Sequence, residues 1–525
     1  RTLTTVIRAL SNHSSDYRAT TKLFHAVTKQ YSRAWQAMGG SQLQTQDLLL
    51  LLFGFKNTSN SKRDISMCLK HLVDSVLQNA TERDFKATTG DDSHDFNGYL
   101  SAYALSNALI GLRGMSNSSE TVTSEGMIAV DHILSMFADA LNALRDYDVA
   151  EDDKYVFTAK HLSVALQGLQ GLSCGASHDS GYASPPLSFS PSSSTSSSSS
   201  SSSSATGMTS PVPPVVLLLD ALHATLQHQQ LMSHSTTDPS SQRLDLVQGM
   251  SLAQCSRALY GLLRIHHQAS SSTATLKSNL LTRSKEVLTE KYGEDATQMH
   301  KRDIVNISEL LELQRVLHLY VFMYKDDALP VGVSEATSVS AREKKGRLFH
   351  DNVCKMSTWL NEYISQSAII VKENETSDNS TLERRFRKAI LAAITSPDFM
   401  NATEVADRDS NPYEKVALSS NTNIQGFDVD MIVTFSKDGM EDFVYNLEID
   451  GPHHKKPHKE AFFRLRDAVL LKSGFVHRVR RVSLFKDNDP RRVQVINKSA
   501  RDAVVRSELQ LMLAAVLGDT STSTS

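Results

Sequence analysis

A short apolar motif built around one glycine recurs through the N-terminal half of this chain. Leu105–Ser116 closely matches Leu162–Ser173, a further copy is recognisable at Cys255–Leu262, and a degraded copy lies at Leu48–Phe55. The central glycines of the four copies are Gly54, Gly111, Gly168 and Gly261. The first three are spaced 57 residues apart, and the last interval is longer. Such a period is typical of an array of similar units that pack on one another.

A second apolar-periodic segment follows each motif. These segments are Ile65–Leu77, Met127–Leu144, Val215–Leu226 and Leu276–Leu288. Apolar residues recur at helical spacing in both segments, which predicts two helices per repeat. Because one helix pair cannot bury its own apolar face, we expect residues 1–290 to form an α-solenoid of helical-pair repeats. A glycine inside a helix costs about 1 kcal/mol relative to alanine, and close packing on a neighbouring helix would offset this cost.

Three other segments differ from the repeats in composition. Residues 184–214 are rich in serine and proline and cannot bury apolar surface, so we expect a disordered insertion that lengthens the last interval. Residues 291–375 are charged and helical in pattern, and we interpret them as a helical bridge in which 307–323 is the clearest amphipathic stretch. Residues 519–525 are expected to be a disordered tail.

Composition bounds the class of protein without naming a function. The 525 residues carry a formal net charge of −3, and the four cysteines are far apart in the sequence. No Cys-x-x-Cys pair is present, which argues against a zinc module or a disulfide scaffold and fits a reducing compartment. No apolar run approaches the roughly 20 residues that span a bilayer, so no membrane partner is expected.

From Leu382 onward the pattern changes to that of a compact α/β domain, which we place at residues 380–518. Two strands that meet at the turn Ser436–Gly439 predict a hairpin. The expected elements are a helix at Leu382–Ile394, strands at Phe427–Phe435 and Phe443–Asp450, a helix at Ala461–Ser473 capped by Gly474, a β-rich segment at Phe475–Leu484 and a helix at Ala500–Leu517.

The second of these strands ends in a group of residues suited to chemistry. Glu448 and Asp450 alternate on one face, and Gly-Pro-His453 follows and ends the strand. Carboxylates at a strand end are what a divalent cation or general acid–base catalysis requires. Asp428 and Asp430 alternate on the preceding strand, and we expect one of them to join the same pocket.

A basic segment follows this motif directly. From His453 to Arg492 there are twelve Lys or Arg and four Asp or Glu, a local charge of +8. A charge run is usually a solvated surface, but a basic face of this density also fits a polyanion such as nucleic acid. Arg478 and Arg480 alternate onto one face, where their guanidinium groups could bind phosphates. The candidate RNA-binding residues are Lys455, Lys456, Arg464, Arg466, Arg478, Arg480 and Arg481.

Four stretches of this domain together resemble a RAP domain, the "RNA-binding domain abundant in Apicomplexans". They are Phe427–Ile432, Leu447–His453, Arg464–Leu471 and Gly474–Val479, within a core of about 427–486. Leu447–His453 contains the E-[VI]-D-G-P part of the family hallmark, an E-[VI]-D-G-P-x-H stretch. The Ala-Leu-x-Gly-Leu repeats resemble the octotricopeptide and heptatricopeptide-like arrays that accompany RAP domains.

The resemblance implies a restriction-endonuclease-like fold for this domain. In that fold a helical Glu, an Asp on one strand and a D/E-x-K on the next strand assemble a magnesium site. Carried over, Glu383 is the candidate helical acid, Asp428 or Asp430 the first strand acid, and Glu448 the acid of D/E-x-K. The candidate metal ligands are thus Asp428, Glu448 and Asp450.

One position departs from the nuclease pattern. Asp450 stands where the nucleases have the lysine that positions or activates the attacking water. His453 or Lys455 is the nearest substitute, and the sequence does not decide between them. This departure favours RNA binding over cleavage.

The resemblance therefore predicts an RNA-binding protein of mitochondrial RNA metabolism, acting in RNA processing, stability, rRNA maturation or translation. Single-stranded RNA and ribonucleoprotein or mitoribosomal components are the expected partners. No particular cofactor is implied, except magnesium if the protein is a nuclease. Two alternatives remain open: a magnesium-dependent endoribonuclease that uses Glu448 and Asp450 with Asp428 and His453, and a protein-interaction scaffold without RNA.

Overall fold

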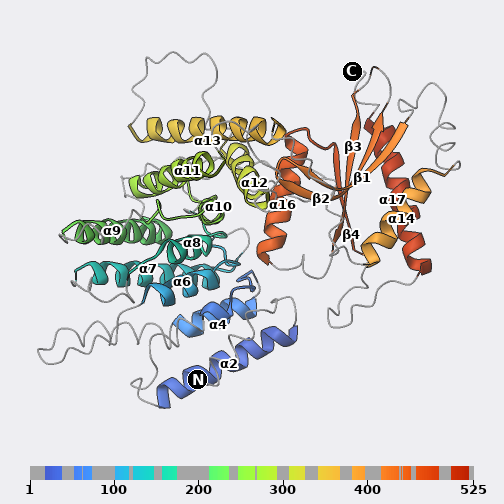
Figure 1. Ribbon diagram of the computed structural model, residues 1–525. Coiled ribbons are helices and arrows are strands. Elements are labelled where there is room, and N and C mark those ends of the chain that lie inside the picture. The colour runs from blue at the N-terminus through green and yellow to red at the C-terminus, as the bar shows by residue number, and fades with distance from the viewer. Residues whose placement is uncertain are drawn as a thin grey trace, which may run out of the picture. The chain divides into compact units, whose positions relative to one another are not determined.

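The described structure is mostly helical, with a small mixed sheet near the C-terminus (Figure 1). The chain divides into two compact units, and the boundaries between them lie at α10 (Leu252–Gly261) and within α11 (Ser271–Tyr292). The first unit includes Thr21–Gly249 and Gly261–Asn279, and the second includes Met250–Tyr260 and Leu280–Ser525. The computed structural model describes residues 18–37, 52–61, 63–73, 101–117, 122–146, 156–173, 212–235, 246–266, 269–292, 307–324, 341–366, 381–396, 415–436, 439, 441–450, 457–483 and 498–519.

Helices of the first unit stack in two layers. The helices that carry the glycine motif contact one another, as α6 contacts α8, and the helices between them form the second layer, in which α7 contacts both α4 and α9 (Figure 1). The helices predicted to follow each motif are confirmed. The helices before α10 are α2 (Arg18–Ala37), α4 (Arg63–Leu72), α6 (Ala102–Gly111), α7 (Ser124–Asp146), α8 (Ala159–Gln167) and α9 (Pro214–Ser235).

The motif glycines allow neighbouring backbones to come together at the same place in each repeat. A Cβ atom added to a glycine would overlap the backbone of one leucine, in the pairs Gly111–Leu52, Gly168–Leu109 and Gly261–Leu166. Each leucine lies two residues before the motif glycine of the preceding repeat. Glycine is required because no larger residue permits this approach. Three contacts with one register indicate that the repeats pack alike.

An asparagine side chain joins the motif loop of the first repeat to that of the second, and another joins the second to the third. Asn60 donates to the backbone oxygen of Ser116 at 2.6 Å and accepts from its backbone N–H at 2.9 Å. Asn117 makes the same two bonds with Ser173, each at 2.8 Å. Both asparagines are buried. We call this pair of bonds the asparagine clasp.

Three of the motif helices begin at a hydroxyl cap. Ser101, Thr158 and Ser251 each lie ten residues before a motif glycine, and their side-chain oxygens accept from the backbone N–H three residues on, at 3.2, 3.2 and 3.3 Å. Such caps satisfy N–H groups that have no partner within the helix. The N-terminal boundary of the motif helix is thus fixed locally.

The sheet of the second unit has the strand order β1-β2-β3-β4. β1 (Lys415–Ile424), β2 (Phe427–Ser436) and β3 (Phe443–Asp450) are antiparallel neighbours, and β4 (Arg478–Ser483) runs parallel to β3. The predicted hairpin is confirmed as β2–β3. β1 was not predicted: it joins β2 through Gln425 and Gly426, whose φ values are 53° and 83°, as a two-residue hairpin turn requires.

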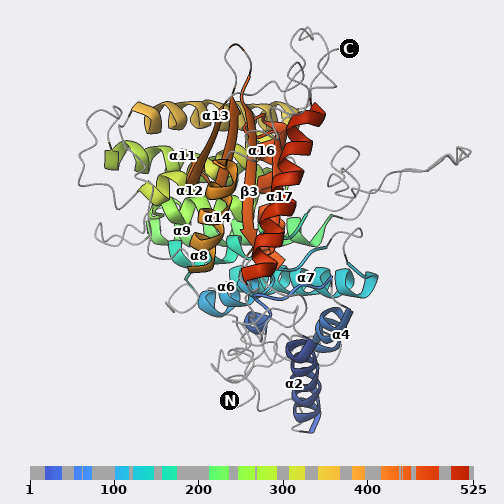
Figure 2. The same ribbon diagram turned by 90° about the vertical axis from the view of Figure 1, so that its right-hand side faces the viewer.

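Helices cover both faces of this sheet (Figures 1 and 2). The face with Met431, Leu447 and Ile449 packs on α14 and α17 and forms the hydrophobic core of the domain. α16 lies against the opposite face and joins the parallel strands β3 and β4. The helices of the second unit after α11 are α12 (Ile307–Met323), α13 (Ala341–Gln366), α14 (Thr381–Ile394), α16 (Pro457–Lys472) and α17 (Lys498–Asp519).

The helices predicted in the C-terminal domain are confirmed, and Gly474 follows α16 with a φ of 73°. Residues 184–211 of the predicted insertion and residues 520–525 of the tail lie outside the described residues. The domain boundaries at 290–291 and 375–380 stay predictions.

Among the described helices, none combines the length and the low polarity needed to cross a bilayer.

Candidate functional site: an arginine–carboxylate network

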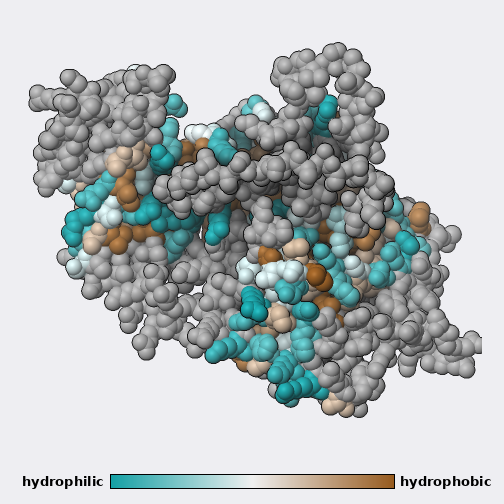
Figure 3. Space-filling model, turned by 180° about the vertical axis from the view of Figure 1, so that it is seen from behind, coloured by the Kyte–Doolittle hydropathy of each residue, from teal (hydrophilic) through white to brown (hydrophobic). Residues whose placement is uncertain are grey.

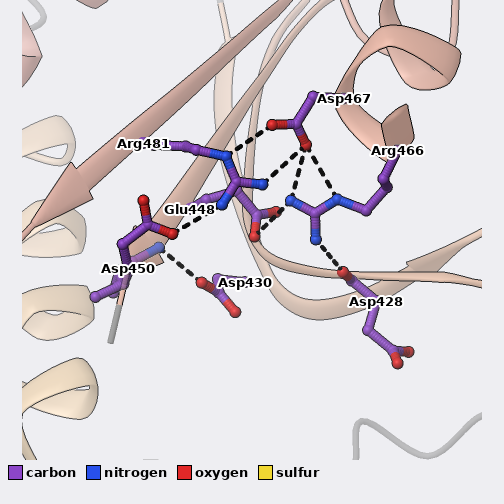
Figure 4. A network of polar contacts seen from close by, with 8 residues as sticks. Asp428, Asp430, Glu448, Asp450, Arg466, Asp467 and Arg481 are labelled. Carbon is purple, nitrogen blue, oxygen red and sulfur yellow. Dashed lines mark hydrogen bonds and ion pairs between the residues drawn. The ribbon is translucent and has the colours of Figure 1, made fainter. Parts of the chain in front are cut away.

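The strand-end motif lies between the sheet and α16. Alternation along β3 directs Glu448 and Asp450 to the α16 side, while Leu447 and Ile449 enter the hydrophobic core. β4 is paired with β3 so that Arg481 lies beside Glu448. Figure 4 shows that these side chains converge with those of α16 on one polar network.

Glu448 is the most deeply buried acid of the network. Its Oε2 atom is 2.9 Å from Nη2 of Arg466, and the two side chains are 2% and 3% exposed. Its other oxygen has no hydrogen-bond partner among the described residues. Arg466 also donates from Nη1 to the backbone oxygen of Asp428 at 2.9 Å. The guanidinium group is therefore what balances a carboxylate that burial would otherwise disfavour.

Asp467 connects the two arginines. It accepts from Nε and Nη2 of Arg466 at 3.0 and 2.9 Å, and from Nε and Nη2 of Arg481 at 2.7 and 3.1 Å. Arg481 also donates from Nη1 to Asp450 at 2.8 Å. The guanidinium carbons of both arginines lie near the ring of Phe463, at 5.1 and 5.0 Å from its centroid. The network thus fixes α16 to β3 and β4.

Electrostatics keep Arg481 charged. Burial alone would lower the pKa of Arg481, but hydrogen bonding to Asp467 and the nearby charges of Asp467, Asp450 and Glu448 raise it above its ordinary value. Two guanidinium groups face three carboxylates, so the described network has one more negative than positive charge. An added anion would be repelled here, not attracted.

The two candidate acids of β2 do not share a role. Asp430 accepts from the backbone N–H of Ile449 at 2.7 Å and so binds the strand itself. Asp428 is exposed, and its side chain accepts from Asn423 at 2.9 Å. Only the backbone of Asp428 reaches the network.

A magnesium ion does not fit the described residues. No group of three or more His, Cys, Asp or Glu side chains within the described part of the chain converges to hold a metal. Glu448 and Asp450 each direct a carboxylate oxygen at an arginine, in the place where a metal ligand would direct it at the ion. The backbone of Glu383 lies in α14, on the far face of the sheet, while its side chain and all of His453 lie outside what is described.

The candidate RNA-binding residues differ in position and exposure. Arg466 and Arg481 are held in the network, and Arg480 lies on the other face, 3.1 Å from Glu508 of α17. Hydrogen bonding to Glu508 raises the pKa of Arg480. Arg478 shares that face, as predicted, and is exposed, as is Arg464. Lys455 and Lys456 lie outside the described residues.

Sequence reasoning missed Asp467 and Glu508, the acids that hold these arginines. Asp467 adjoins Arg466 in the sequence, but side chains one residue apart on a helix do not face each other, so this adjacency alone does not predict the pairing. Glu508 gave no signal either, because it lies in a helix whose partner strand is not apparent from spacing. Comparisons of the chain with family models, with curated proteins and with solved structures give no match.

Proposed function

We propose that this chain is an RNA-binding protein in which an α-solenoid binds single-stranded RNA and is followed by an α/β domain of the RAP type. The recurring glycine contacts and asparagine clasp support the solenoid. The sheet with α14 and α17 on one face and α16 on the other supports a restriction-endonuclease-like domain. The role in mitochondrial RNA metabolism rests on the family resemblance alone.

The observation that carries the proposal is the charge of the motif segments. Residues 52–61, 101–117, 156–173 and 246–266 contain no Asp or Glu, although 58 of the 525 residues are acidic. Their cations are Lys56, Arg113, Lys160, Arg257 and Arg264. The helices between them do carry acids, for instance Asp64 in α4 and Glu125 in α7. Acids are thus absent from these four described motif segments, which favours a polyanion there.

Side chains on this layer also suit unstacked bases. Tyr103 is 57% exposed, and its ring meets His161 of the next repeat edge to face at 6.2 Å. Lys160 is exposed beside them, and Arg113 donates to Gln170 of the next repeat at 2.9 Å. Single-stranded RNA is bound by exposed aromatic rings that stack on its bases and by cations that contact its phosphates, and this layer offers both kinds of side chain.

The two alternatives have weaker support. An endonuclease needs free carboxylates, and the arginines of the network engage Glu448, Asp450 and Asp467. A protein-interaction scaffold usually exposes a contiguous apolar patch. On the face seen from behind, hydrophobic residues of the described surface are scattered among hydrophilic ones (Figure 3).

Fluorescence anisotropy with the full chain and a labelled, unstructured RNA tests the proposal. Binding should weaken as salt rises, with a slope of about −0.7 in log K against log[salt] for each phosphate contact. Lys160→Ala should weaken binding and reduce that slope, and Tyr103→Ala should weaken binding with the slope unchanged. Lys70→Ala and Lys285→Ala, which remove exposed cations from the other helix layer, are the matched controls.

The proposal fails if the full chain does not bind RNA at low salt, and the scaffold alternative then stands. It also fails if the control variants lose as much affinity as Lys160→Ala, because the charge pattern of the motif segments would then have no bearing on binding.

A further inference from the structure

Helix α12, which we interpreted from sequence as part of a bridge, continues the repeat without its glycine. Leu313–Tyr320 aligns with Cys255–Leu262, and Leu319 stands 58 residues after Gly261. Burial agrees position by position: the buried, intermediate and exposed residues of one segment match those of the other, apart from the partly buried Arg315 opposite the exposed Arg257. α13 follows α12 in the sequence and contacts it.

A different contact replaces the missing glycine. In the other repeats a glycine backbone reaches the leucine two positions before the preceding motif glycine. The equivalent leucine of the fourth repeat is Leu259, and its carbonyl oxygen accepts from the buried hydroxyl of Tyr320 at 2.7 Å. α12 therefore contacts α10 at the position that a fifth repeat would use.

The C-terminal domain packs on one face of these two motif helices. Phe462 of α16 meets Tyr260 edge to face at 5.7 Å, and Arg315 lies over the same ring at 5.4 Å. His318 meets Phe475 at 6.3 Å. Tyr260 and His318 occupy equivalent positions, one residue before the motif glycine or its replacement.

The β1–β2 turn makes the closest approach. A Cβ atom on Gly426 would lie 2.6 Å from the backbone nitrogen of Arg315 and 2.6 Å from the backbone oxygen of Leu311. Gln425 beside it accepts from Gln314 at 3.3 Å. A turn that packs this closely on a helix backbone indicates a stable contact and not a transient one.

We infer that α12 and α13 are a fifth repeat and that the C-terminal domain occupies the motif-helix face of repeats four and five, which confines bound RNA to the motif helices of the first three repeats. The part of this inference that concerns RNA rests on the proposed function. The part that concerns the covered face does not, because it follows from contacts within the second unit. The chain's own α16 and β1–β2 turn thus close the array at its C-terminal end, where repeat proteins need a cap.

Two glycines of the sheet provide a matched test. Gly426 and Gly439 both have a φ of 83°, but nothing lies within 4 Å of a Cβ atom placed on Gly439. Gly426→Ala and Gly439→Ala therefore carry the same backbone strain, and only Gly426→Ala disturbs the contact with α12. Arg315→Ala is a second variant, since it removes the contact with Phe462 from the α12 side.

Hydrogen exchange measured by mass spectrometry tests the covered face without RNA. Gly426→Ala should raise exchange at least tenfold in α12 and α16, Arg315→Ala should raise it less, and Gly439→Ala should match the unmodified protein. Equal exchange in the two glycine variants would overturn the inference.

Crosslinking with 4-thiouridine RNA tests the restriction on RNA. In the unmodified full chain, crosslinks should map to 52–61, 101–117 and 156–173, and Gly426→Ala should add crosslinks in α10 and α12. Crosslinks on Tyr260 or His318 in the unmodified protein would overturn the inference while leaving the proposed function intact. If the chain binds no RNA, the proposed function fails, and the exchange measurement still decides whether the face is covered.

Discussion

Glu448 lies in the interior of the C-terminal domain, and Arg466 is the cation that balances its charge. This pairing changes the meaning of the strand-end motif. Taken from sequence, Glu448 and Asp450 are an acidic pair facing a basic segment. In the folded domain, two arginines of that segment turn inward and bind the acids, so the motif stabilises the packing of α16 on the sheet.

Glu448→Ala should therefore destabilise the protein. Removing one partner of a buried ion pair leaves the other charge unbalanced, and we expect a loss of about 3–5 kcal/mol in the free energy of unfolding. Urea unfolding of the full chain, monitored in the transition that reports the C-terminal domain, measures this loss. Glu441→Ala, at an exposed position just before β3, is the control and should change stability by less than about 0.5 kcal/mol.

Added magnesium tests whether these carboxylates bind a metal ion instead of the arginines. At constant ionic strength, magnesium chloride should leave the unfolding midpoint of the unmodified protein unchanged. A clear rise would show that the carboxylates bind the metal and would contradict the network described for them.

The burial of Cys68 and Cys255 predicts that their thiols react slowly and that the stability of the protein falls at alkaline pH. Burial raises the pKa of the Cys68 thiol to about 12 and that of Cys255 to about 11. At pH 8 the thiolate fractions are then on the order of one in ten thousand and one in a thousand. Iodoacetamide should alkylate both far more slowly in the native protein than in urea, as read by mass spectrometry, while the half-buried Cys354 should react sooner.

The raised pKa values of these two thiols also determine how the free energy of unfolding changes with pH. These thiols stay protonated in the folded state and ionise on unfolding above about pH 8.5. Their contribution to stability is fully present below that pH and is lost as the pH rises toward 11 and 12. Stability that is flat between pH 8 and 11 would contradict the burial of these groups.

Among the repeated elements, the motif glycines decide how closely neighbouring helices pack. Gly168→Ala would place a methyl group against the backbone of Leu109, and backbone atoms cannot move aside as a side-chain end can. We expect a loss of about 1–3 kcal/mol, or more where the helices cannot separate. Gly249→Ala is the matched control, because its nearest neighbours would lie at 3.7 and 3.8 Å, in ordinary contact. Thermal unfolding of the two variants should separate them, and equal midpoints would contradict the close packing.

Elements with a strong apolar pattern were predictable from sequence, and elements whose pattern is weakened by their place in the fold were not. β2 and β3 have one face in the hydrophobic core, so their alternation is clear. β1 is an edge strand, and its second half, Ser-Ser-Asn-Thr-Asn, has no apolar alternation to detect. α12 was predicted as a helix, but its place in the repeat was hidden because Leu319 replaces the glycine that marks the other copies. Glu448 and Asp450 could be named from sequence, but Asp467 could not. The pairing of these acids with Arg466 and Arg481 was not predictable either, because it depends on which face of the sheet each strand residue occupies.

For the second unit as a whole, the contacts of Phe462, Phe475 and Gly426 with α10 and α12 predict that the C-terminal domain depends on the last repeats. A fragment of residues 375–525 should expose these aromatic residues and show lower solubility and a lower unfolding midpoint than a fragment of 246–525. Circular dichroism and size-exclusion chromatography compare the two. A 375–525 fragment as stable as the longer one would contradict the docking of the domain.

The asparagine clasp has a consequence for how such a chain can evolve. Asn60 and Asn117 bind backbone groups of the next repeat, and a backbone offers the same groups whatever residue carries it. A duplicated 57-residue unit of the first or second repeat would bring its own asparagine and present the groups that its neighbour's asparagine requires. These two repeats can therefore be gained or lost without a matching change elsewhere, whereas the third and fourth repeats, with Cys174 and His267 at the equivalent position, do not carry the asparagine.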